Sequence, residues 1–160
     1  MKTKQLVFAS LLAGYTAISM IACKPKNTSN AVSGDAAAKA YVAPGKYDEF
    51  YNFVSGGFSG QMSVYGLPSG RLLRVIPVFS QDPEKGWGFS EETKPMLNTS
   101  HGNIPWDDLH HTQLSKTAGE IDGRWCFANA NNTPRVARVD LSTFRTAEII
   151  ELPNSGGNHS

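Results

Sequence analysis

The sequence has little of several features that mark common classes of protein. It has only two cysteines, Cys23 and Cys126, far apart in the chain, so we expect no structural disulfide. Neither sign of charge is in clear excess, with 15 Lys and Arg against 14 Asp and Glu, which argues against a nucleic-acid partner. No convincing helical pattern follows the N-terminal apolar segment. The 15 glycines and 9 prolines suit the boundaries of short strands instead.

The N-terminus has the layout of an export signal. Lys2 and Lys4 supply positive charge, and the mostly apolar segment from Leu6 to Ile21 follows them. This segment is too short and too interrupted for a transmembrane helix. We therefore predict that residues 1–22 are a signal peptide.

Cys23 directly follows Ala22 and resembles the cysteine of a bacterial lipobox. On this interpretation Cys23 is lipidated, becomes the mature N-terminus, and anchors a periplasmic protein to the membrane. Met20 departs from the usual Leu or Val, so a plain cleaved signal with an incidental cysteine is the alternative. Cys126 lies in a hydrophobic run and is predicted to be a buried, small apolar residue.

The remainder divides into a spacer and a folded region. Residues 23–46 are small and polar, and we predict a disordered spacer there. Residues 47–160 carry short strand-like segments, namely Phe50–Val54, Gln61–Tyr65, Leu72–Phe79, Trp125–Ala128, Val136–Leu141 and Ala147–Leu152. They indicate an all-β fold of small sheets, for which a sandwich, a barrel and a propeller all remain open. Ser80–Asp107 is irregular and typical of a functional or docking loop.

Two adjacent histidines, His110 and His111, follow the acidic pair Asp107 and Asp108. Imidazole is a good ligand for copper, zinc, iron and nickel, and a carboxylate can fix the tautomer of a liganding ring. Neighbours in an ideal strand point to opposite faces, so both rings reach one metal cluster only where the backbone is irregular or the cluster is large. From these residues alone, an exposed polar pair is at least as good an interpretation of His110 and His111 as a pair of metal ligands. For Asp107 and Asp108, solvated loop acids are the favoured interpretation. Equally, His159 fits a disordered tail and His101 a loop.

Seven motifs along the folded region, taken in order, resemble those of nitrous-oxide reductases. They are Tyr65-Gly66-Leu67-Pro68-Ser69-Gly70-Arg71, Ile76-Pro77-Val78-Phe79, Gly86-Trp87-Gly88, Asp108-Leu109-His110-His111, Asp122-Gly123-Arg124, Asn132-Thr133-Pro134-Arg135-Val136-Ala137-Arg138 and Ile150-Glu151-Leu152-Pro153-Asn154. The N-terminal signal, with no twin-arginine in residues 1–4, resembles the branch exported through the general secretory route. The chain is similar to the N-terminal part of that family.

The resemblance implies a copper oxidoreductase that reduces N2O to N2 and water, the last step of denitrification. It implies the first blades of a seven-bladed β-propeller over residues 47–160, with a tetranuclear, sulfide-bridged copper centre on the propeller axis. By the same resemblance His110, His111 and His159 are copper ligands, because His159 stands at the spacing of the family's third ligand. Asp107 and Asp108 are then candidates for orienting these ligands. No catalytic residue separate from the metal ligands is implied.

The resemblance also implies parts that this chain lacks. These are four further cluster histidines and a C-terminal cupredoxin domain with a dinuclear electron-entry centre; calcium also belongs to the absent part. We therefore expect a partial sequence that is inactive by itself. For the full-length protein the implied partners are a second copy in a homodimer and a c-type cytochrome or cupredoxin as electron donor. The alternatives are a metal-free, propeller-type scaffold or binding lipoprotein of the cell envelope, and a zinc hydrolase using Asp107 or Asp108 as third ligand.

Overall fold

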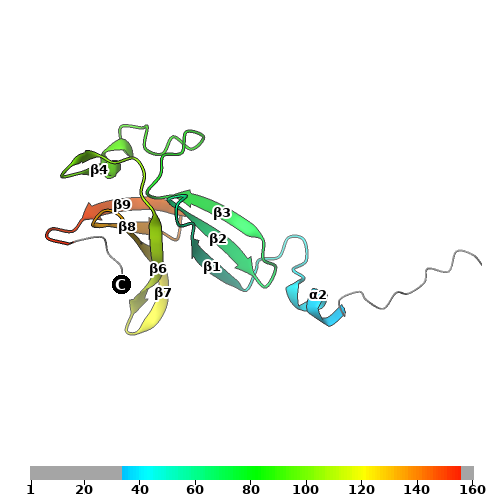
Figure 1. The fold of residues 1–160 in the computed structure, drawn as a ribbon. Coiled ribbons are helices and arrows are strands. Elements are labelled where there is room, and N and C mark those ends of the chain that lie inside the picture. The colour runs from blue at the N-terminus through cyan, green and yellow to red at the C-terminus, as the bar shows by residue number, and fades with distance from the viewer. Residues whose placement is uncertain (1–33, 156–160) are drawn as a thin grey trace, which may run out of the picture. The chain divides into compact units, whose positions relative to one another are not determined.

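The computed structural model describes residues 34–155, and most of their regular structure is antiparallel β-sheet (Figure 1). One three-stranded sheet has the order β1-β2-β3, and one four-stranded sheet has the order β6-β7-β8-β9. The strands of the first sheet are β1 (Phe50–Ser55), β2 (Gln61–Leu67) and β3 (Leu72–Pro77). Those of the second are β6 (Leu109–Thr117), β7 (Glu120–Ala130), β8 (Arg135–Asp140) and β9 (Arg145–Glu151). The all-β prediction is confirmed.

The predicted spacer, residues 23–46, contains a short helix, α2 (Gly34–Ala40), which the sequence analysis did not foresee. Four of its seven residues are alanine, the residue with the highest intrinsic helix propensity, and this accounts for the local structure. The predicted signal peptide and Cys23 lie outside the described residues. No helix in the described part of the chain is long and apolar enough to span a membrane.

Strand β6 is missing from the predicted strands. Its sequence is largely polar, and only Leu109 among its nine residues is buried, so the apolar alternation that marks a half-buried strand is weak. A two-residue turn joins β6 to β7, in which Ala118 and Gly119 have φ angles of 51° and 88°. Positive φ at both positions is the feature of hairpin turns whose twist matches that of the flanking strands. The hairpin, rather than hydrophobic pattern, therefore specifies β6.

The two larger sheets share one hydrophobic core. Met62 and Val64 on β2 alternate with more exposed neighbours, and Cys126 and Ala128 on β7 do the same. The buried cluster contains Met62, Val64, Ile76, Val78, Phe79, Leu109, Cys126, Ala128, Ala130, Ala137 and Val139. The sheets do not close into a barrel, and this arrangement fits part of a propeller, in which small antiparallel sheets pack in succession.

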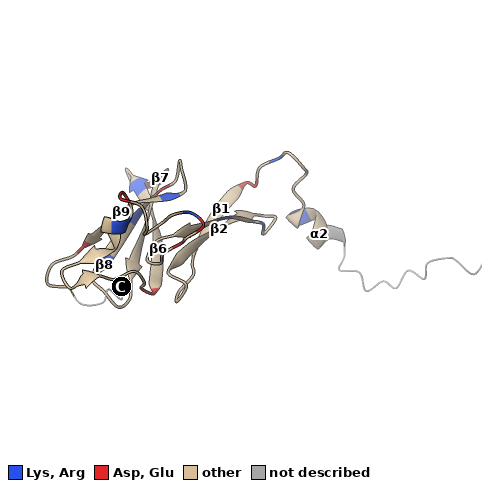
Figure 2. Cartoon of the chain, turned by 90° about the horizontal axis from the view of Figure 1, so that it is seen from above, with Lys and Arg blue, Asp and Glu red and all other residues tan. Residues whose placement is uncertain are grey.

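The long stretch from Ser80 to Asp107 is mostly irregular, as predicted, but it has fixed internal structure. It contains the 3-10 helix η1 (Lys94–Leu97) and a small hairpin of β4 (Asn98–Thr99) and β5 (Gly102–Asn103). Single bridges join Asp82 to Trp87 and Ser80 to Trp106. Positively and negatively charged residues are interspersed along the described sheets (Figure 2).

Gly60 sets the contact between the β1–β2 turn and the segment that leads to the paired histidines. Its carbonyl accepts the N–H groups of Val78 and Phe79 at 3.2 and 2.8 Å, and its φ is +65°. A Cβ placed on Gly60 would lie 2.7 Å from the carbonyl oxygen of Phe79 and 2.9 Å from that of Asp107. Both obstacles are backbone atoms, so no side-chain rotation relieves the clash.

We expect Gly60→Ala to lower the free energy of unfolding by more than about 2 kcal/mol, because a left-handed φ and a backbone clash act together. Gly86→Ala is the matched control, since Gly86 has φ +68° but no atom within 4 Å of its added Cβ. It should cost only about 1 kcal/mol from φ alone. Urea denaturation of both variants measures the difference. Equal losses would show that the Gly60 contact is not tight.

Candidate metal centre at the paired histidines

His110 and His111 lie in a β-bulge near the start of β6. Leu109 pairs with Ala130 and Thr112 with Ala128, so β6 advances three residues while β7 advances two. The extra residue breaks the regular alternation of side chains. The two imidazole rings lie with centroids 5.6 Å apart and planes at 81°. This irregular backbone is the condition under which adjacent histidines can serve one site.

Both histidines line the same open groove between β1 and the start of β6. The groove has a volume of about 590 Å³. Its lining residues are Asn52, Phe53, Val54, Ser55, Gly57, Leu109, His110, His111 and Thr112. His110 is half-buried and His111 is exposed. Both residues therefore border one groove, and His111 also borders a second hollow beside Phe127 and Ala128.

The strand that carries the histidines is fastened to the first sheet on both sides of the pair. Before the pair, the Leu109 N–H donates to the Gly57 carbonyl at 3.0 Å, and the Ser55 hydroxyl donates to the Leu109 carbonyl. After it, the Thr112 hydroxyl donates to the Phe53 carbonyl at 3.0 Å. The two imidazoles thus project from a bulge whose flanking residues are fixed.

Asp108 positions the first imidazole. Its Oδ2 lies 3.0 Å from His110 Nε2, and its side chain is only 5% exposed. A carboxylate accepts hydrogen bonds, so this contact favours the neutral tautomer of His110 that carries its proton on Nε2. Asp108 Oδ1 is buried and has no hydrogen-bond partner among the described residues. The interpretation of Asp108 as a solvated loop acid is wrong, because the fold buries it beside the ring.

Asp107 is buried as well, with 1% of its surface exposed, so the same interpretation is wrong for this residue. Its Oδ1 accepts the backbone N–H of Asn132 at 2.9 Å, and its Oδ2 accepts the Thr133 hydroxyl and a guanidinium N–H of Arg135 at 3.3 Å. Burial raises the pKa of Asp107, but hydrogen bonds from Thr133, Asn132 and Arg135 together outweigh it and hold the pKa below its ordinary value. Asp107 therefore ties the turn before the histidines to the β7–β8 turn.

Arg135 completes this clamp and was not singled out from the sequence. Its side chain is fully buried, donates from Nε to the Thr133 hydroxyl at 2.7 Å and from Nη1 to the Ile104 carbonyl at 3.1 Å. Its guanidinium also lies 5.3 Å from the centroid of the Phe79 ring. The sequence did contain a sign of its burial, because Arg135, Ala137 and Val139 are alternate residues of β8 and therefore lie on the same, buried face.

The structure leaves other predicted residues apart from this site. His159 and Cys23 lie outside the described residues, so the three-histidine prediction stays a prediction. His101 is an exposed loop residue, as expected. Cys126 is buried, as predicted, and burial raises the pKa of its thiol to about 11. Within residues 34–155 no three His, Cys, Asp or Glu side chains are grouped to hold a metal ion.

Small antiparallel sheets packed as in part of a propeller, with a histidine pair exposed in a bulge, define a β-protein with a partial candidate metal site. No protein-family model matches the chain. The chain is 37% identical to a nitrous-oxide reductase from Pseudomonas fluorescens over 153 residues, and this match covers 96% of the chain. It is also similar to the nitrous-oxide reductases of Cupriavidus necator, with 37% identity over 84% of the chain, and of Stutzerimonas stutzeri, with 38% identity over 76%.

The resemblance to nitrous-oxide reductases is thereby confirmed over most of the chain. The chain spans only part of those relatives, namely 24%, 22% and 19% of their respective lengths. The similarity therefore concerns a portion of the proteins it matches.

Proposed function

We propose that this chain is part of a nitrous-oxide reductase and that His110, His111 and His159 are ligands of its copper centre. The observation that carries the proposal is the bulge in β6, which places two adjacent imidazoles in one groove. The relatives are named for the reduction of nitrous oxide, and this supports the same reaction for the protein to which the chain belongs.

The donor set fits copper in its chemistry. Neutral imidazole nitrogen is a suitable ligand for copper, and a carboxylate on the opposite ring nitrogen orients the ring and raises its basicity. Asp108 stands in that position toward His110. A tetranuclear copper centre would supply both a Lewis acid that binds N2O and the electrons for its two-electron reduction.

The residues of this chain have distinct parts in that proposal. His110 and His111 would hold copper through imidazole nitrogen lone pairs and so would transfer no proton while bound. Asp108 would orient the His110 ring by accepting a hydrogen bond from its Nε2–H group. The buried Asp107–Arg135 pair keeps the turn that carries Asp108 in place without touching substrate.

The setting of the protein is part of the same proposal. We infer export to the periplasm with lipidation at Cys23. We also infer a homodimer and electron entry from a c-type cytochrome or cupredoxin through a cupredoxin domain in a longer chain.

Copper titration of the 160-residue chain tests the proposal against a metal-free scaffold. We expect stoichiometric binding of Cu(I), with X-ray absorption showing nitrogen ligands, because two positioned imidazoles form a partial site. Zinc alone bound by the same groove would favour the hydrolase alternative, although Asp107 is already committed to Arg135, Thr133 and Asn132. A full-length protein that takes up no stoichiometric copper would favour a scaffold.

A further inference from the structure

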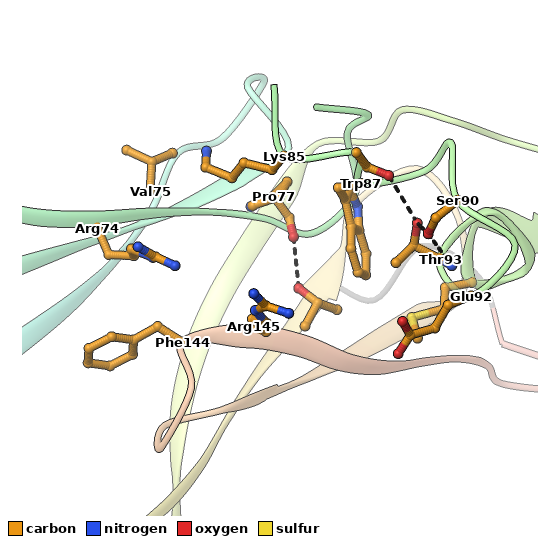
Figure 3. Close-up of a pocket in the computed structure, with 13 residues that line it drawn as sticks. Arg74, Val75, Pro77, Lys85, Trp87, Ser90, Glu92, Thr93, Phe144 and Arg145 are labelled. Carbon is orange, nitrogen blue, oxygen red and sulfur yellow. Dashed lines mark hydrogen bonds between the residues drawn. The ribbon is translucent and has the colours of Figure 1, made fainter. Parts of the chain in front are cut away.

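A second hollow lies away from the histidine groove, between the end of β3, the loop around Trp87 and the start of β9 (Figure 3). Its volume is about 360 Å³, enough for a small organic molecule. The Thr146 hydroxyl donates to the Pro77 carbonyl at 2.8 Å and closes one side of it. None of the three histidines within residues 34–155 contributes to its walls.

The positive charge of this pocket is only partly neutralised. Arg74 and Arg145 both line it and project into the space between β3 and β9 (Figure 3). Neither guanidinium has a hydrogen bond or ion pair with another described residue. Lys85, on the rim, is already paired with Asp82 at 2.6 Å. Both arginines are exposed to solvent, so their attraction for an anion at the mouth of the hollow is screened by water, and their planar donor geometry suits a carboxylate.

Trp87 and Phe144 supply apolar parts of the walls, whereas Ser90, Glu92, Thr93 and Thr146 are polar. Trp87 is 7% exposed and stands in the pocket, and its buried indole N–H has no acceptor among the described residues. That N–H is covered in the present arrangement, so a shift of the ring is needed before it can reach a ligand oxygen. An unsatisfied buried donor is costly, which favours such a shift when an acceptor arrives.

Phe144 holds the other wall in an uncommon conformation. Its φ of 51° is one that bulky residues rarely adopt. The ring packs against Tyr51 and Phe53 with centroid distances of 6.1 Å each, and these contacts offset the strain. Because Phe144 directly precedes Arg145, this packing also fixes the backbone position from which the Arg145 side chain extends.

Glu92 makes one end of the pocket negatively charged, opposite the end that carries the arginines. It lies across Trp87 from Arg74 in Figure 3, and its carboxylate disfavours a second anion at that end. We propose that this pocket binds a small organic carboxylate, with the carboxylate between Arg74 and Arg145 and the apolar body against Trp87 and Phe144. The proposal does not depend on copper or on the histidine pair.

Benzoate is a suitable probe, with benzyl alcohol as the neutral molecule of similar shape. Benzoate should shift the Trp87 indole N–H resonance in two-dimensional NMR with a dissociation constant on the order of millimolar, whereas benzyl alcohol should not. Arg74→Gln with Arg145→Gln should weaken benzoate binding roughly tenfold or more, because two charge-assisted contacts are lost.

Arg124→Gln is the matched control, since Arg124 is an exposed arginine on β7 that does not line the pocket. It should leave benzoate affinity unchanged. An unaltered backbone spectrum of the double variant excludes misfolding as the cause of its lost binding. Equal shifts from benzoate and benzyl alcohol, no shift from either, or full benzoate affinity in the double variant would overturn the proposal.

Discussion

His110→Ala, and separately His111→Ala, should each remove most of the copper that the chain binds. Each variant deletes one of two imidazoles that share a groove, and the remaining ring is a weak site by itself. We expect the apparent Cu(I) affinity to fall by at least roughly 100-fold, a loss larger than that usually caused by removing a group that only orients a ligand. Competition with a colorimetric Cu(I) chelator measures the affinity directly.

His101→Ala is the matched control for both variants. His101 is an exposed loop histidine outside the groove, so its loss should leave the copper content unchanged. Asp108→Asn provides a graded comparison: it keeps the shape but removes the charge beside His110 Nε2, and affinity should fall roughly 10-fold to 100-fold. Full copper retention in His110→Ala and His111→Ala would show that these residues are not ligands.

Arg135→Met should cause the largest loss of stability of any single change considered for this fold. Arg135 and Asp107 are 0% and 1% exposed, so removing the cation leaves a carboxylate buried without its charged partner. Breaking a buried ion pair in this way typically costs about 3–5 kcal/mol. Methionine fills a similar volume, so the loss reports mainly on charge rather than on a cavity. Urea denaturation at neutral pH measures it.

The pH dependence gives an independent check of the cause. The folded-state pKa of Asp107 is below its ordinary value, so its contribution to stability is present above the unfolded-state pKa. That contribution is lost as pH falls through the folded-state pKa. The stability gap between the wild-type chain and Arg135→Met should therefore narrow with acidification below the ordinary pKa range of aspartate.

Asp107→Asn combined with Arg135→Met is the control for the orphaned charge. The double variant should be more stable than Arg135→Met alone, because no buried carboxylate remains uncompensated. The same substitution at an exposed position of β7, Arg124→Met, should alter stability by no more than about 0.5 kcal/mol. If Arg135→Met lost no more stability than Arg124→Met, the ion pair between Asp107 and Arg135 would not stabilise the turn.

The strands with strong apolar or alternating patterns were predictable from the sequence. β2 and β8 bury every second residue, and the predicted strands over those segments are confirmed. β6 was not predictable in the same way, because its partner strand and its hairpin turn, rather than its own hydrophobicity, hold it in the sheet. Local sequence pattern does not encode such support from a neighbour.

The candidate site, like the strands, was predictable only in part. The types of its residues, two imidazoles after two carboxylates, were evident, and they indicated metal chemistry. The sequence pattern did not show that the acidic residues are buried. The residues alone favoured solvated acids, whereas the β7–β8 turn covers both Asp107 and Asp108. That turn is distant in sequence, and its contacts with Asp107 depend on the register of β7 and β8.

The bulge in β6 has a consequence for comparing histidine-rich sequences. One unpaired residue decides whether neighbouring imidazoles share a groove, so the same His-His dipeptide in a regular strand would present a single ring to each face. Adding one residue to β7 opposite the pair would make the pairing regular and part the two rings while sparing both histidines. Strand register, and not dipeptide composition alone, is therefore the property to compare when such pairs are sought in other β-proteins.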